Sequence, residues 1–134
     1  MRRDVYSGYL SLSRGSSDKD LKAYSIGAAN NLADTLMKRG HYHEALPLLL
    51  ETIPKSQLAL GKNHDYTFKL QRMHAQILYE KEGASHDDLT LAVAMLEDVD
   101  RRQRRTLGPN HPQRKMTQAR LELARGKQAT AHAL

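Results

Sequence analysis

The sequence predicts an all-α protein made of stacked helical hairpins, and three observations support this prediction. Ala and Leu are plentiful while aromatic residues make up only 5% of the chain, which favours helices over strands. Apolar residues recur at helical spacing, as in Ala29, Leu32 and Leu36. The pattern L-G-x-N-H occurs twice, at 60–64 and 107–111, where helices would end and restart. The 134 residues suit one ordinary domain.

The repeated L-G-x-N-H stretch has the composition of a joint between two helices. Gly61 and Gly108 are expected to adopt the left-handed conformation that stops a helix. The asparagine or the histidine that follows is expected to cap the next helix. Pro112 and, in the first copy, Asp65 then occupy the first helical position, where proline and a carboxylate are both favourable.

Other joints complete the predicted order of elements. The stretches 17–20 and 85–88 resemble capping boxes with Asp in place of Glu, and Gly40 and Gly83 lie where preceding helices should end. Residues 5–13 are expected to be the remnant of a further helix. The predicted helices cover residues 19–39, 42–60, 65–81, 87–106 and 112–125.

The chain contains an internal repeat. Ala33 aligns with Ala75 and Gly61 aligns with Gly108, and the second offset is longer than the first by five residues. The extra residues fall in the stretch 80–91, between two predicted helices, where a hairpin repeat tolerates an insertion. The predicted organisation is an N-terminal segment, a first repeat, a second repeat with a loop insertion, and a partial third repeat with a polar tail: 1–17, 18–64, 65–111 and 112–134.

The first repeat resembles the tetratricopeptide repeat of the kinesin light chain type. That pattern runs N-L-A-x-x-L-x-x-x-G-x-Y-x-E-A and, after a second helix, L-G-x-x-H-P-x-T-L. The matching residues are Asn31, Leu32, Ala33, Leu36, Gly40, Tyr42, Glu44, Ala45, Leu60, Gly61, His64 and Thr67, followed by Leu107, Gly108, His111 and Pro112 in the second copy. The resemblance covers about residues 18–122 and implies a right-handed superhelix of stacked antiparallel hairpins.

The resemblance also implies a binding groove lined by the first helix of each repeat. Asn31 matches the asparagine that holds a ligand's backbone in this family, because its amide both donates and accepts hydrogen bonds. Met73 and Arg120 occupy the equivalent later places, so the series of asparagines is interrupted. The predicted ligand is an extended, acidic peptide segment of a protein partner. The predicted groove residues are Asn31, Lys38, Lys69, Arg72, Tyr79 and Arg120.

Two alternatives to peptide binding remain open. The net charge of +6 and the arginine-rich stretch 101–105 are compatible with a basic, nucleic-acid-binding helical domain. The second alternative is self-association of a broken repeat array through its exposed ends, because the later copies depart from the repeat pattern and the polar tail lacks a clear capping helix.

Catalytic, metal and membrane functions have no support in the sequence. No phosphate-binding loop or nucleophile–base pattern occurs, and the seven histidines lack the spacing that metal ligands need, so we expect no enzyme, metal or cofactor. The chain has no cysteine, which excludes disulfides and thiolate chemistry. We expect neither a signal peptide nor a membrane span, and therefore a cytoplasmic protein.

Overall fold

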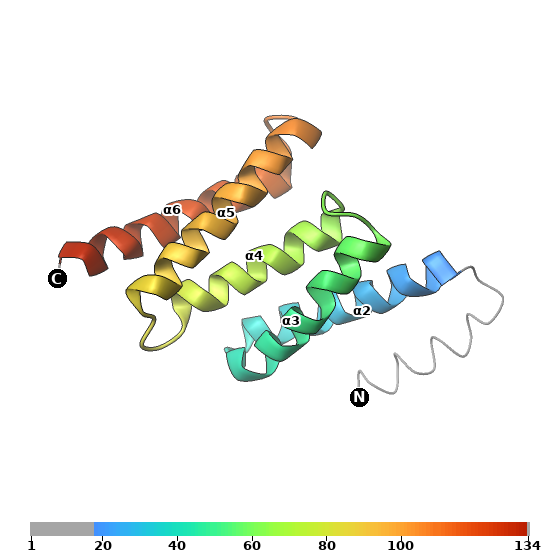
Figure 1. The fold of residues 1–134 in the computed structure, drawn as a ribbon, viewed down its shortest axis with the longest axis horizontal. Helices are drawn as coiled ribbons and strands as arrows, with labels where there is room; N and C mark the ends of the chain where they lie inside the picture. Colours follow the sequence, from blue (N-terminus) through green and yellow to red (C-terminus); the bar gives the residue numbers. More distant parts are fainter. Residues whose placement is uncertain (1–17, 134) are drawn as a thin grey trace. The chain divides into compact units, whose positions relative to one another are not determined.

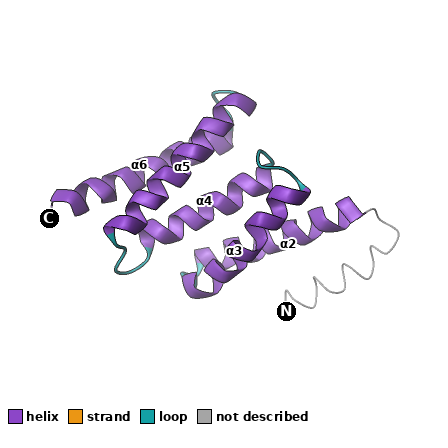
Figure 2. Cartoon of the chain, viewed as in Figure 1, coloured by secondary structure: helices purple, strands orange, loops and turns teal. Residues whose placement is uncertain are grey.

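The computed structural model describes residues 18–133 as five consecutive α-helices (Figure 1). No strand occurs in this part of the chain, as Figure 2 shows. The predicted all-α fold class is therefore confirmed. The remnant helix predicted at 5–13 lies outside the described residues. The helices are α2 (Asp18–Lys38), α3 (Tyr42–Ala59), α4 (Asp65–Glu80), α5 (His86–Thr106) and α6 (Pro112–Ala133).

The predicted end of the last helix was wrong. The sequence pattern predicted an end at residue 125 followed by a polar tail, whereas α6 continues to Ala133. Tertiary contacts explain the extension. Ala131 packs against the apolar core, Gln128 Nε2 donates to Thr90 Oγ1 at 3.2 Å, and Lys127 Nζ donates to the carbonyl oxygen of Tyr79 at 3.1 Å. A polar sequence thus remains helical because one of its faces is packed.

Glycine ends three of the helices as predicted, and fails to do so at one joint. Gly40, Gly61 and Gly83 have φ of +73°, +99° and +73°, in the left-handed region. Gly108 does not adopt this conformation, so its predicted role was wrong. Here α5 ends on an extended Leu107 with φ −125° and ψ 147°. Proline follows Gly108 directly, and the residue before a proline is held in extended conformations.

Side chains cap the starts of three helices. Ser85 Oγ accepts from the Asp88 N–H at 3.0 Å, and the Asp88 carboxylate accepts from the Ser85 N–H at 2.9 Å, which confirms the predicted capping box of α5. At α4 and α6 the caps are imidazoles. His64 Nδ1 accepts from the N–H of Tyr66 at 3.0 Å, and His111 Nδ1 accepts from the N–H of Gln113 at 3.1 Å. The histidine of each L-G-x-N-H stretch, rather than the asparagine, is the cap.

The chain forms two compact units, Met1–Leu70 and Gln71–Leu134, which we call the N-terminal and C-terminal units. In the N-terminal unit α2 packs against α3. The buried apolar side chains of these two helices are Ile26, Ala33, Met37, Ala45 and Leu49. They lie four or seven residues apart along each helix, so each helix presents one apolar face.

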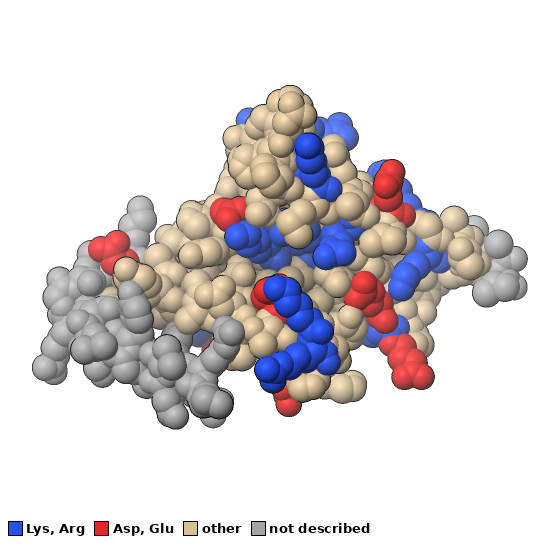
Figure 3. Space-filling model, turned by 180° about the vertical axis from the view of Figure 1, so that it is seen from behind, with Lys and Arg blue, Asp and Glu red and all other residues tan. Residues whose placement is uncertain are grey.

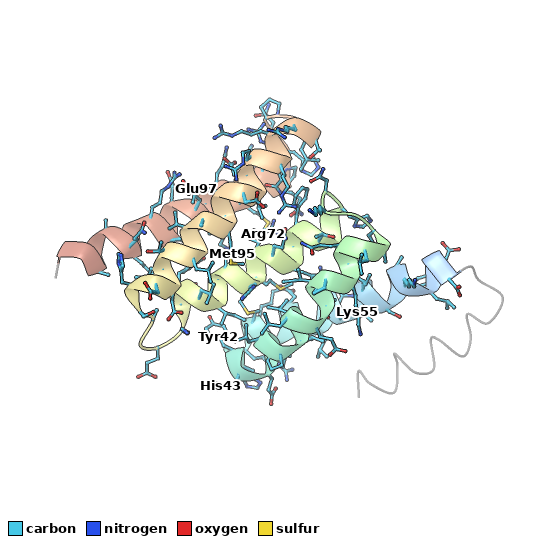
Figure 4. The ribbon with its side chains drawn as sticks, in the orientation of Figure 1. Tyr42, His43, Lys55, Arg72, Met95 and Glu97 are labelled. Atoms are coloured by element: carbon cyan, nitrogen blue, oxygen red, sulfur yellow. The ribbon has the colours of Figure 1, made fainter. Side chains whose placement is uncertain are left out.

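In the C-terminal unit the last part of α4 packs with α5 and α6. The buried cluster consists of Ala75, Leu78, Tyr79, Leu89, Ala92, Val93, Leu96, Leu121 and Ala124. On the surface of this unit Glu97, labelled on α5 in Figure 4, accepts from Arg125 of α6 at 2.9 Å. An exposed ion pair of this kind adds little stability, so the apolar cluster holds the unit together.

Candidate functional site

One face of α2 carries two of the three residues predicted to bind a ligand in the N-terminal unit, Asn31 and Lys38. Residues spaced three or four apart along a helix share a face, and we call this set the α2 stripe. Asn31 and Lys38 are both exposed on it. The stripe consists of Asp20, Tyr24, Gly27, Asn31, Asp34 and Lys38.

The polar groups around Asn31 divide into exposed and buried ones. Lys38 Nζ lies 2.9 Å from Asp34 Oδ2, and both side chains are largely exposed, so this pair costs little to separate. The neighbouring Asn30 is buried, and its Nδ2 has no hydrogen-bond partner among the described residues. Of these two neighbouring asparagines, Asn31 is therefore the one with an exposed side chain.

Lys69 lies on α4, within the N-terminal unit. Its Nζ lies 3.1 Å from Asp65 Oδ2, one helical turn earlier, and its side chain is one third exposed. A carboxylate of a ligand would compete with Asp65 for this ammonium group. Since a half-exposed i,i+4 pair contributes only about 0.3–0.5 kcal/mol, the competition is not strongly opposed.

A cleft that the sequence analysis missed lies beside the start of α2. It has a volume of about 430 Å³ and is lined by Asp20, Ala23, Tyr24 and Tyr66. Tyr24 and Tyr66 are separated by the same offset as Ala33 and Ala75, so they are equivalent positions of successive repeats. This equivalence is visible in the sequence, but only the fold shows that both rings border one cleft.

The predicted residues Arg72 and Tyr79 are buried. Arg72, labelled on α4 in Figure 4, is 6% exposed, and its Nη2 donates to Met116 Sδ at 3.9 Å. Tyr79 is 2% exposed and belongs to the apolar cluster of the C-terminal unit. Tyr79 shares a helix face with Ala75 and Leu78, and that apolar face packs inward. Neither side chain presents an open surface in this structure.

Two basic side chains of α6, Lys127 and Arg120, lie beside Tyr79. Lys127 Nζ lies 3.1 Å from the Tyr79 carbonyl oxygen and 5.5 Å from the centre of its ring. Burial raises the pKa of the Tyr79 hydroxyl, while the Arg120 guanidinium beside it acts in the opposite direction. Arg120 is partly exposed, and Lys127 is exposed. Lys127 was missed because it follows the residue at which the sequence analysis ended the helix.

The structure brings the six predicted residues into two groups. Asn31, Lys38 and Lys69 belong to the N-terminal unit, and the other three belong to the C-terminal unit, where Arg120 lies beside Tyr79. Basic and acidic side chains both appear on the face drawn in Figure 3. Their assignment to ligand binding stays a prediction.

The arginine-rich stretch of α5 is largely paired with carboxylates of its own helix. Arg101 and Arg102 reach Asp98 at 3.2 and 2.9 Å, and Arg104 reaches Asp100 at 3.0 Å. Arg102 also donates to Gln71 Oε1 at 2.6 Å. These ion pairs reduce the positive field that a nucleic acid backbone would meet, and they do not favour the nucleic-acid alternative.

Within the described residues, no group of three or more His, Asp or Glu side chains is placed to hold a metal ion. None of the helices in residues 18–133 is both long enough and apolar enough to cross a bilayer.

Comparison with protein families identifies a match. A family model described as tetratricopeptide repeat matches residues 25–66 and 84–113, which together are more than half of the chain. The first match spans about the last two thirds of α2, all of α3 and the joint that follows, and the second spans α5 and its joint. No curated protein and no solved structure matches the chain.

Proposed function

The chain belongs to the tetratricopeptide repeat family, and we propose that its α2 stripe and the basic groups of α4 and α6 bind an extended, acidic peptide segment. The family match implies a protein–protein interaction module, a class of scaffold that is typically non-catalytic. The acidic character of the ligand and the residues that hold it are the parts that we propose.

The observation that carries this proposal is the exposed Asn31 on the same face of α2 as Lys38. An amide side chain can both donate to a peptide carbonyl and accept from a peptide N–H, which suits an extended backbone. Lys69, Arg120 and Lys127 add cations on α4 and α6. Because these side chains are exposed or partly exposed, an ion pair between any of them and a ligand carboxylate contributes about 0.2–1 kcal/mol.

We further propose that the repeats are of the kinesin light chain type. The stretch from Asn31 to Ala45 and the L-G-x-x-H joints support this subtype. In the same proposal the repeats occupy 18–64 and 65–111, with a partial third repeat after them. The chain contains no cysteine, which is compatible with the reducing environment of the cytoplasm, and we propose the cytoplasm as its location.

Selection of peptides from a random display library on the purified chain tests the proposal. Asn31→Ala and Lys69→Glu are selected in parallel. Lys55→Glu serves as the matched control, because Lys55 is an exposed α3 lysine in an i,i+4 pair with Glu51 (Figure 4). We expect an acidic consensus that is lost in the first two variants and retained in the control. Equal enrichment on all four proteins would disprove the assigned surface.

A further inference from the structure

The cleft beside the start of α2 combines two tyrosine rings with a carboxylate. Asp20 and Tyr24 are four residues apart on the α2 stripe, and Tyr66 of α4 also lines the cleft (Figure 1 shows α2 and α4). Tyr24 is 51% exposed, so its ring presents much of its surface to the cleft and to solvent. All the lining residues belong to the N-terminal unit.

The ring of Tyr66 is held in place by its surroundings. A Cβ built on Gly27 would lie 3.2 Å from the Tyr66 hydroxyl oxygen and 3.3 Å from Cζ, so the ring rests against α2 where a side chain is missing. The His64 ring lies 5.2 Å from it, tilted by 46°, and His64 Nδ1 accepts from the Tyr66 N–H. A wall fixed before binding loses little entropy when a ligand arrives.

The one charged side chain among the residues that line the cleft is the carboxylate of Asp20. Asp18 and Asp20 both lie in the first turn of the helix. A carboxylate beside aromatic faces is the arrangement that suits an ammonium or guanidinium group, because the ring faces are electron-rich and the carboxylate forms a charge-assisted hydrogen bond. A phosphate or carboxylate ligand would instead be repelled by Asp20, and an apolar ligand would bury its charge at a cost.

We propose that this cleft binds the cationic side chain, arginine or lysine, of the same peptide whose backbone contacts Asn31. The inference deepens the proposed function and rests on it. The peptide ligand then carries both signs of charge. Its acidic residues bind the basic groups of α4 and α6, and one basic residue binds in the cleft.

The geometry of α2 fixes the spacing between the two contacts. Asn31 follows Tyr24 by two helical turns and Asp20 by three, which is about 10–16 Å along the helix axis. An extended peptide advances about 3.3 Å per residue, so about three to five ligand residues separate the basic side chain from the residue at Asn31. A selected consensus must therefore show a basic position at this distance from its centre.

Binding of acetyl-arginine amide to the full chain, with the tyrosine rings ¹³C-labelled for NMR, is the direct test. Acetyl-citrulline amide, which has nearly the same shape without the charge, is the matched control ligand. We expect the Tyr24 and Tyr66 signals, assigned with Tyr→Phe variants, to shift saturably with the arginine derivative only. The Tyr79 signal should stay in place because that ring is buried in the C-terminal unit. Asp20→Asn should weaken binding about tenfold.

Shifts of the same size with the citrulline derivative, or no shift of either cleft tyrosine, would overturn the inference. Its failure is distinguishable from failure of the proposed function. If selected peptides depend on Asn31 but bind Asp20→Asn with unchanged affinity, the cationic site is wrong and the peptide surface stands. If arginine binds the cleft while no peptide depends on Asn31, the proposed function is wrong instead, and the cleft is left as an isolated cation site.

Discussion

The hydroxyl oxygens of Ser56 and Thr67 lie 2.6 Å apart and join the end of α3 to the first turn of α4. Thr67 Oγ1 also donates to the carbonyl oxygen of Gly61 at 2.8 Å. Because a hydroxyl has a single proton, Ser56 is the donor in the contact between the two side chains. Both side chains are fully buried, so this chain of hydrogen bonds ties the first joint to the interior of the unit.

Replacing Thr67 with valine should destabilise the chain. The substitution keeps the side-chain shape, removes the bond to Gly61 and leaves Ser56 Oγ buried without its acceptor, at a cost of about 1–3 kcal/mol. Urea denaturation followed by circular dichroism measures the loss. Thr106→Val is the control, because Thr106 is exposed and makes one bond to a carbonyl of its own helix. Equal midpoints for the two variants would contradict the role of the joint.

Gln103 occupies the position in the second copy that Ser56 holds in the first. It is fully buried, and neither amide atom has a hydrogen-bond partner among the described residues. Gln103→Met keeps a similar volume and removes the buried amide, so we expect stability to rise by about 1–3 kcal/mol. The melting temperature measures the change, with the exposed Gln118→Met as the control. A fall in melting temperature for Gln103→Met alone would show that the amide is hydrogen-bonded in solution.

The imidazole cap of α4 should be replaceable by a better cap. His64→Ala removes the acceptor of the Tyr66 N–H and should cost about 1 kcal/mol, whereas His64→Asp restores an acceptor and adds a charge that favours the helix start. Thermal unfolding of both variants gives the comparison. His43→Ala is the control, since His43 is exposed on α3 (Figure 4). The idea fails if His64→Asp is no more stable than His64→Ala.

Stability should fall as the solution becomes mildly acidic, and His74 should account for part of the fall. Burial lowers the pKa of His74 below its ordinary value of 6.5. Between that value and the lower folded pKa, the unfolded chain binds more protons than the folded one, so stability is present above 6.5 and is lost as pH decreases. Urea midpoints measured at neutral and mildly acidic pH give the slope. His74→Gln, which cannot titrate, should flatten it, and an unchanged slope would exclude His74.

Helix ends were the most predictable part of this fold. Glycine, capping serine and the L-G-x-N-H stretches act through their own backbone neighbours, so a short window of sequence contains the cause. The two exceptions, at Gly108 and at the end of α6, have other causes. At Gly108 the proline that follows prevents the left-handed conformation. The helix α6 is extended by contacts that Lys127 and Gln128 make with residues distant in the sequence.

The candidate site was less predictable, because burial depends on packing rather than on spacing alone. Asn31 and Lys38 are exposed as the repeat pattern predicts. Arg72 and Tyr79 were chosen by the same pattern, yet both are buried. Spacing places a residue on a face but does not tell whether a neighbouring helix covers that face. The cleft between Tyr24 and Tyr66 likewise required the fold, since the two residues lie on different helices.

The hydrogen bonds of the first joint also bear on how fast the chain folds. The Ser56–Thr67 contact spans eleven positions, and the bonds from Thr67 to Gly61 and from Tyr66 to His64 span six and two. Closing such short loops costs little conformational entropy, and proteins rich in contacts of low sequence separation cross the folding barrier quickly. The α3–α4 turn is therefore suited to form early in folding and to serve as a nucleus against which α2 packs later.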